Sequence, residues 1–293
     1  MRTRTAFQEL NLSDDYLFEK VMENEIVLKA VIEKILDIRI SRLEIIQPQR
    51  MIEIRPEAKG IRLDVFADDA EGNRYSVEMQ KWNEYNLNKR GRYYHSMMAL
   101  DLLEKGEPYR NLRNSCVIFI RLFDPFRQGR HRYTFEQRCL ENLEMGLNDG
   151  MKTVFLSTKG FQNDTDNDIL AFLKYIEEST DEVARASESK LVRLLHQQVK
   201  SVKNNQALEA EFMKLLERDE RNYERGLEEG IKEGITQGLK RGLDYGIRAM
   251  ILDNIEADIP KHLIIDKLQK RFEIDRDTAE SYYDNIAETK DED

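Results

Sequence analysis

The sequence contains little cysteine and histidine and no long apolar run. Two cysteines, Cys116 and Cys139, and four histidines occur in 293 residues, and there is no Cys-x-x-Cys pair. This pattern argues against a disulfide framework and against a zinc site built from cysteine and histidine. Apolar runs stay shorter than the roughly 18 residues of a membrane-spanning helix, and no signal-peptide segment follows the Met-Arg-Thr-Arg-Thr start. We expect a soluble, cytoplasmic protein with no membrane contact.

The charge balance limits how the protein can approach nucleic acid. The net charge is −10, with 35% charged and 40% apolar residues. A negative chain has no general attraction for DNA, so any DNA contact must rely on local basic clusters and metal ions. Two such clusters are present. The first comprises Lys89, Arg90 and Arg92, and the second comprises Arg121, Arg127, Arg130, His131 and Arg132.

Apolar residues alternate with mostly polar ones in two stretches between Gly60 and Lys81, and a short polar turn separates the two stretches. Apolar residues occupy every second position from Ile61 to Ala67, and the alternation resumes from Tyr75 to Met79. Alternation of period two around a turn rich in Gly, Asn and Asp is typical of a β-hairpin with one buried face. We therefore predict a hairpin whose polar side chains gather on its other face.

Two acidic residues face each other on that polar face if the residues flanking the turn are paired. This register places Asp64 opposite Glu78, with Cβ atoms roughly 5 Å apart, and Arg62 opposite Gln80. Carboxylates at this distance repel each other, whereas a hard divalent ion such as Mg²⁺ binds between them. The alternative is a chance acidic pair on a solvated face, where water weakens the repulsion.

The acidic pair belongs to an ordered set of short motifs that resembles a known family. Asp64, followed fourteen positions later by Glu78-Met-Gln80, is similar to the Asp…(Asp/Glu)-x-Lys signature of the PD-(D/E)XK nuclease superfamily. The closer resemblance is to its bacterial recombination-promoting nuclease and transposase family, in which the last motif is commonly Glu-x-Gln. Further matches are Asp15-Tyr-Leu-Phe18, Arg90-Gly-Arg-Tyr93-Tyr94, Gly106-Glu-Pro-Tyr109, the apolar run Val117–Ile120 and a glycine-punctuated C-terminal helix.

The resemblance implies an α/β fold, with a restriction-endonuclease-like αβββαβ core, a mixed sheet and an all-helical C-terminal region. Local patterns predict the same order: two helices between Asp14 and Asp37, a strand over Leu43–Gln47 ended by Pro48, the hairpin, a helix to Leu103 and a strand within Asn114–Leu122. Segments 133–135 and 153–156 are candidates for two further strands. The expected parts are a nuclease-like core with peripheral strands (1–165), a helical linker region (166–225), a glycine helix (226–250) and a C-terminal helical pair (251–293).

The same resemblance implies a metal-dependent DNA endonuclease of the transposase or recombination-promoting type. Asp64, Glu78 and the Met79 carbonyl would hold Mg²⁺, with Mn²⁺ as a substitute, and Gln80 would complete the catalytic set. Four further residues are candidates for contacts beside the metal or to phosphate: Asp15, Arg62, Arg90 and Tyr94.

Gln80 is the main departure from the superfamily signature, because a lysine usually stands there. A glutamine orients water but brings no charge, so Arg62 across the hairpin would have to supply one. The alternative function is a catalytically weak or inactive protein of the same fold that acts as a DNA-binding or assembly partner.

Glycine recurs at every fourth position from Gly226 to Gly246, and a Leu or Ile follows each one. The intervening charged residues indicate a helix, although each glycine costs about 0.5–1 kcal/mol relative to alanine. A close helix–helix contact would offset this loss, because small residues let two backbones approach. We expect a homodimer formed through Gly226–Ile247. The alternative is an exposed helix without a partner.

Overall fold

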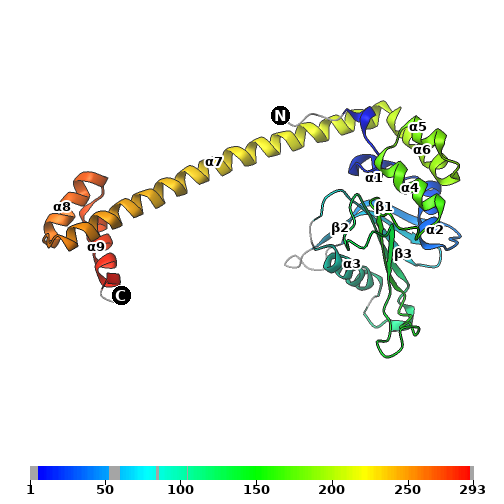
Figure 1. Cartoon of the computed structure of the whole chain (residues 1–293), viewed down its shortest axis with the longest axis horizontal. Helices are drawn as coiled ribbons and strands as arrows, with labels where there is room; N and C mark the ends of the chain where they lie inside the picture. Colours follow the sequence, from blue (N-terminus) through cyan, green and yellow to red (C-terminus); the bar gives the residue numbers. More distant parts are fainter. Residues whose placement is uncertain (1–5, 53–59, 84–85, 104, 291–293) are drawn as a thin grey trace. The chain divides into compact units, whose positions relative to one another are not determined.

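The computed structural model describes residues 6–52, 60–83, 86–103 and 105–290 (Figure 1). The chain forms two compact units, Met1–Met213 and Lys214–Asp293. Helix α7 (Gln206–Glu256) crosses this division and runs without a break through 225/226 and 250/251, where the sequence suggested boundaries.

A mixed sheet of six strands lies at the centre of the first unit. Its spatial order is β1-β2-β3-β4-β6-β5, with β3, β4 and β6 parallel and the other neighbours antiparallel. The predicted α/β class and mixed sheet are confirmed, and the two candidate strands near 133 and 153 extend the sheet. The strands are β1 (Leu43–Ile52), β2 (Ile61–Asp69), β3 (Arg74–Gln80), β4 (Ser115–Arg121), β5 (Arg132–Phe135) and β6 (Met151–Ser157).

The first strand is longer than predicted. Pro48 does not end β1, which continues to Ile52 with Pro48 opposite Val65. A proline lacks the N–H of a ladder hydrogen bond, but β1 is an edge strand with a neighbour on one side only, where this loss is tolerated. The predicted end at Gln47 is therefore five residues too early. Residues 53–59 lie outside the described part of the chain.

The predicted hairpin register is confirmed from Val65 opposite Val77 to Asp68 opposite Arg74. The prediction that only one face of the hairpin is buried is wrong, because Ser76 and Glu78 on the other face are fully buried. Helix α3 (Leu87–Leu102) covers this face and shares a core cluster with side chains of β2, β4 and β6. Figure 1 shows α3 and the other first-unit helices on opposite sides of the sheet.

The opposite face is covered by helices from both ends of the first unit. Helices α1 (Asp15–Met22) and α2 (Glu25–Leu36) contact β1 or β2, and α6 (Lys190–Lys203) packs against both helices. Asn24 separates α1 from α2, and its side chain accepts hydrogen bonds from the N–H groups of Ile26 and Val27. Helix α4 (Asn167–Glu177) and the short helix α5 (Asp181–Ala186) lie within the stretch 166–225 that was expected to be helical.

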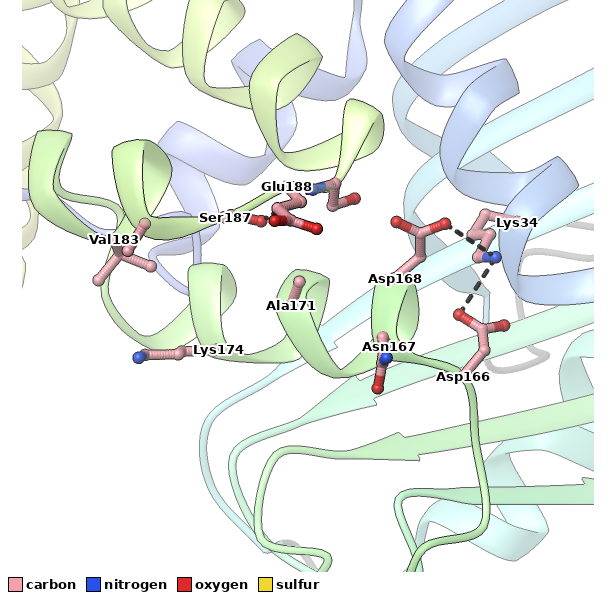
Figure 2. Close-up of a pocket in the computed structure, with 11 residues that line it drawn as sticks. Lys34, Asp166, Asn167, Asp168, Ala171, Lys174, Val183, Ser187 and Glu188 are labelled. Carbon is pink, nitrogen blue, oxygen red and sulfur yellow. Dashed lines mark hydrogen bonds and ion pairs between the residues drawn. The ribbon is translucent and has the colours of Figure 1, made fainter.

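Figure 2 shows the pocket beside the start of α4. Lys34 of α2 forms ion pairs with Asp166 and Asp168, at 3.1 and 3.3 Å. Asp166 also caps α4 by accepting a hydrogen bond from the Ile169 N–H. These contacts join α2 to α4, so we assign the charged groups of this pocket to structure.

In the second unit, the end of α7 packs against α8 (Lys261–Phe272) and α9 (Arg276–Lys290). Their shared core contains Ile247, Ile251, Ile264, Leu268 and Ala279. Glu273 adopts a left-handed conformation that ends α8 and separates it from α9.

His95 links α3 to the sheet and makes the first unit sensitive to acid. Its ring nitrogens lie 2.7 Å from the Ser115 hydroxyl and 2.9 Å from the Thr153 hydroxyl, and burial lowers its pKa to about 4. The unfolded chain then binds a proton that the folded chain excludes. The contribution of His95 to the free energy of unfolding is fully present above the unfolded pKa of 6.5. It falls as the pH decreases, and at pH 4 about 3 kcal/mol has been lost.

We expect His95→Gln to show a shallower loss of melting temperature between pH 7 and pH 4 than the wild type. His262→Gln, which changes an exposed histidine of α8, is the matched control and should keep the wild-type slope. Parallel slopes for wild type and His95→Gln would contradict this assignment.

Candidate metal centre

Asp64 and Glu78 lie side by side where the ladder between β2 and β3 ends. Beyond Val65 and Val77, side-chain contacts replace backbone pairing. The Asp64 N–H donates to Oε1 of Glu78 at 3.1 Å, and the Met79 N–H donates to Oδ2 of Asp64 at 3.0 Å. The structure therefore brings together the two carboxylates that the sequence analysis paired.

Glu78 is fully buried and has partners for both carboxylate oxygens. The Ser76 hydroxyl donates to Oε1 at 2.7 Å, and Nη2 of Arg90 lies 3.2 Å from Oε2. Arg90 reaches the strand from the first turn of α3. Gly91, the next residue, packs against Phe119 and Thr153, where a Cβ atom would lie 3.4 and 3.7 Å from their side chains. The small residue lets α3 approach the sheet closely and places Arg90 over Glu78.

Burial raises the pKa of both carboxyl groups above their ordinary values. The charge of Asp64 raises the pKa of Glu78 further, while the Ser76 hydroxyl and the Arg90 guanidinium lower it. For Asp64, the Met79 N–H lowers the pKa and the charge of Asp15 raises it. Arg90 therefore offsets only part of the cost of placing two negative charges here, and a further cation would favour the ionised pair.

Arg90 connects three of the predicted site residues. Besides its contact with Glu78, its Nη1 lies 3.4 Å from Oε1 of Gln80 and its Nε donates to the Tyr94 hydroxyl. The Tyr94 hydroxyl in turn lies 3.4 Å from the carbonyl oxygen of Arg62. The exposed side chain of Arg62 contributes through its charge, which lowers the pKa of Asp64. Arg90, rather than Arg62, thus brings positive charge to Gln80.

The first helix also reaches this region. Lys81, directly after β3, forms an ion pair with Asp14, the residue before α1. This contact draws the start of α1 toward the end of β3. Asp15 follows in the first turn and acts on Asp64 electrostatically, as described above. Lys81 was not among the candidate site residues, although its ion pair with Asp14 joins the two elements.

The two basic clusters differ in their surroundings. Arg62, Lys89, Arg90, Arg92 and Tyr93 line a cleft between the start of β2 and α3. This cleft adjoins the acidic pair, because Arg90 belongs to both.

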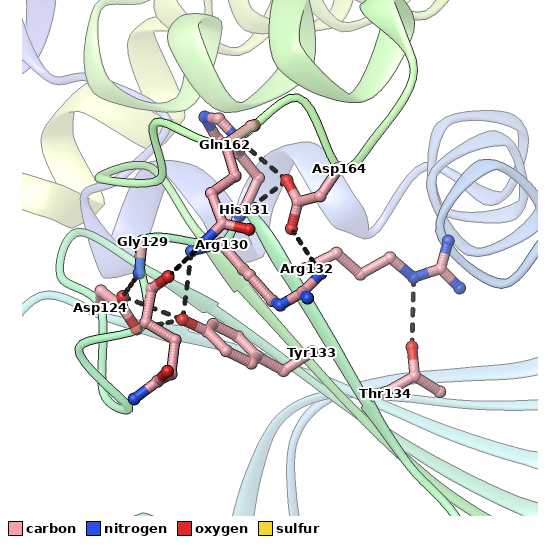
Figure 3. Close-up of polar contacts among 10 residues, drawn as sticks. Asp124, Gly129, Arg130, His131, Arg132, Tyr133, Thr134, Gln162 and Asp164 are labelled. Atoms are coloured by element: carbon pink, nitrogen blue, oxygen red, sulfur yellow. Dashed lines mark hydrogen bonds and ion pairs between the residues drawn. The ribbon is translucent and has the colours of Figure 1, made fainter.

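Two acidic residues, Asp124 and Asp164, contact the loop that carries the second cluster (Figure 3). Asp164 accepts from His131 at 3.2 Å and lies 3.9 Å from Arg130. Asp124 holds the same loop by accepting hydrogen bonds from the Gly129 N–H and the Tyr133 hydroxyl, at 2.7 and 2.8 Å. Arg121, the first member of the cluster, is fully buried. The first cluster is the better candidate for contacts to phosphate.

The carboxylate oxygens of Asp64 and Glu78 are suitable ligands for a hard divalent ion. Mg²⁺ binds one or two carboxylates and keeps several water or phosphate oxygens, so it does not need a cage of protein ligands. A larger site is absent from the described residues, where no group of three or more Asp, Glu, His or Cys side chains is placed to hold a metal ion. The buried Glu78 carboxylate and the half-buried Asp64 carboxylate fit an ion that completes its shell with water and substrate.

The mixed sheet and the acidic pair at the end of its hairpin define an α/β protein of the PD-(D/E)XK type. The model of the PD-(D/E)XK nuclease family transposases matches residues 12–230, and the chain belongs to this family. Among curated proteins and among solved structures, no significant match is found. None of the helices in the described ranges has the length and apolar character required to cross a membrane.

Proposed function

We propose that the protein is a Mg²⁺-dependent DNA endonuclease of the transposase or recombination-promoting type. Asp64, Glu78 and the Met79 carbonyl are the proposed ligands, and Mn²⁺ would substitute for Mg²⁺. The contact between the buried Glu78 carboxylate and the backbone of Asp64 is the observation that carries this proposal. When bound, the metal ion would polarise the scissile phosphate and lower the pKa of a water molecule.

The protein's own residues position the reacting groups. Arg90 holds Glu78 and Gln80 in fixed orientations through one guanidinium. Because Oε1 of Gln80 faces Arg90, the amide N–H groups are directed elsewhere and can donate to a water molecule or a phosphate oxygen. Arg90 and Tyr94 also line the basic cleft, where a DNA strand would find Lys89 and Arg92 for its phosphates.

The second candidate function is a catalytically weak or inactive protein of the same fold that binds DNA or assembles with a partner. Arg90 favours it, because this side chain already supplies a positive charge to Glu78. Gln80 favours it too, since it carries no charge where the superfamily commonly has a lysine. The two functions differ in whether a divalent ion binds at Asp64 and supports cleavage.

Cleavage of several nucleic acids in parallel tests the proposal. Supercoiled plasmid, linear duplex, single-stranded DNA and RNA are incubated with Mg²⁺, Mn²⁺ or a chelator. We expect DNA cleavage with either ion and none with the chelator. DNA binding without cleavage under every condition would support the second candidate function instead.

Gln80 provides a narrower test of the catalytic set. We expect Gln80→Ala to lower the cleavage rate by about 10²-fold, because a positioned hydrogen-bonding group is lost. Gln80→Lys should retain activity, since it restores the residue usual in the superfamily. Gln47→Ala, on the exposed side of β1, is the control and should cleave normally. Equal rates for all four proteins would make Gln80 an ordinary strand residue.

We further propose that α7 forms a homodimer through Gly226–Leu243, because Gly246 and Ile247, at the end of the predicted contact, pack against other residues of the second unit. A Cβ atom added at any of the five glycines from Gly226 to Gly242 would meet nothing within 4 Å, so their positions are open to a second helix. The aliphatic residues that follow them are between 39% and 71% exposed. Acids gather early in this stretch, with Glu228 and Glu233, and bases gather late, with Lys240 and Arg248. An antiparallel copy would therefore bring opposite charges together.

A further inference from the structure

Arg121 is the largest fully buried side chain of the described residues, and no described acid forms an ion pair with it. Its three guanidinium nitrogens are buried and have no hydrogen-bond partner within the ranges that the structure describes. The guanidinium packs instead on aromatic rings, 4.1 Å from the ring centre of Phe155 and 5.3 Å from that of Phe119. Ring faces attract a cation, but they replace only part of its hydration. Burial of this guanidinium without a hydrogen-bonded anion is therefore costly for the fold.

The position of Arg121 connects it to the metal centre. Arg121 is the last residue of β4 and lies opposite Gln80 in the parallel ladder with β3. The preceding pair in this ladder on the same face is Glu78 opposite Phe119, and Phe119 is one of the rings that Arg121 contacts. Burial lowers the pKa of Arg121, the charge of Arg90 lowers it further, and the charge of Asp124 raises it. Arg121 from β4 and Arg90 from α3 thus both bring positive charge toward Gln80.

We propose that Arg121 supplies the fixed positive charge that Gln80 cannot supply to the Asp64–Glu78 centre. Its catalytic consequence rests on the proposed nuclease function. A buried guanidinium acts through a lower dielectric than an exposed one, so at an equal distance its field is stronger. Because the charge is held in place by aromatic rings, no reorganisation is needed when negative charge grows on a phosphate. Arg121 is a positioning residue in this scheme, since its own contacts are with rings.

Replacing Arg121 should change stability and activity in opposite directions. Arg121→Met removes an unpaired buried cation and keeps an apolar side chain against the rings, so the melting temperature should rise by about 2 °C or more. The value of kcat should fall by at least about tenfold with little change in KM, because the field acts on the transition state. Arg121→Lys keeps the charge and should recover part of kcat.

Metal affinity gives a readout that does not depend on cleavage. A fixed cation repels a divalent ion, so Arg121→Met should bind Mn²⁺ about tenfold more tightly than the wild type in calorimetry. Arg113→Met is the matched control: it removes the same charge from an exposed residue just before β4, at the other end of that strand. This variant should match the wild type in Mn²⁺ affinity and cleavage.

The outcomes separate this inference from the proposed function. Tighter Mn²⁺ binding by Arg121→Met in a protein that cleaves no DNA would support the charge assignment and contradict the nuclease. Equal Mn²⁺ affinity in the wild type and Arg121→Met would overturn the inference. A lower melting temperature together with lost activity would overturn it as well, because Arg121 would then be a structural residue.

Discussion

Asp64→Asn and Glu78→Gln should each lower the rate of DNA cleavage by at least about 10³-fold while making the metal-free protein more stable. Each change removes one of two adjacent negative charges and keeps the size of the side chain. Glu78 is fully buried and beside Asp64, so the loss of its charge relieves both burial and repulsion. The melting temperature without metal should rise, and Mn²⁺ affinity in calorimetry should fall.

The matched control for this pair is Glu44→Gln, which neutralises an exposed acid on β1. We expect it to cleave and to bind Mn²⁺ like the wild type. If Asp64→Asn or Glu78→Gln cleaves as fast as Glu44→Gln, the two carboxylates are not the metal ligands. A lower melting temperature in both variants would show that the pair stabilises the fold.

The second large effect is expected at the glycines of α7. In an isolated helix, changing Gly234 and Gly238 to Ala should stabilise the protein by about 0.5–1 kcal/mol per site, because nothing lies near either Cβ position. In a close helix pair the added methyl groups push the backbones apart. The double Ala variant should therefore dimerise at least about tenfold more weakly, and the double Leu variant should be monomeric.

Sedimentation of these variants decides between a dimer and an unpaired helix. Lys232 and Thr236 are four residues apart, each two positions after a glycine, and so lie on the side of α7 opposite the glycines. Changing both to Ala is the control and should leave the dimer intact. A monomeric wild type whose melting temperature rises in the double Ala variant would contradict the proposed contact.

The hairpin could be predicted because its information is local. Period-two alternation and the polar turn determine which residues of β2 and β3 face each other, and the pairing of Val65 with Val77 agrees. The end of β1 could not be predicted in this way. Pro48 is a strand breaker in a central strand and harmless in an edge strand, and the position of a strand in a sheet depends on its neighbours.

How deeply the candidate site is buried depends on α3. The alternation of residues within the hairpin carries no information about where this helix packs. Alternation marks Glu78 as a polar residue on a strand face, but α3 buries that face and brings Arg90 to it. Gly91 is the sequence signal for this close approach, since a glycine within a helix often permits tight packing. Arg121 was assigned to the second basic cluster because it lies close to the other four members along the chain. Only the parallel pairing of β4 with β3 places it opposite Gln80.

Single-turnover cleavage of a labelled DNA duplex tests the central claim most directly. Purified protein and duplex are mixed without metal, the reaction is started with Mg²⁺ and stopped with a chelator, and Glu78→Gln is run beside the wild type at the same concentration. The metal centre proposed at Asp64 and Glu78 predicts cleavage by the wild type only after Mg²⁺ is added, and almost none by Glu78→Gln. Cleavage before Mg²⁺ is added, or equal rates for the two proteins, would contradict it.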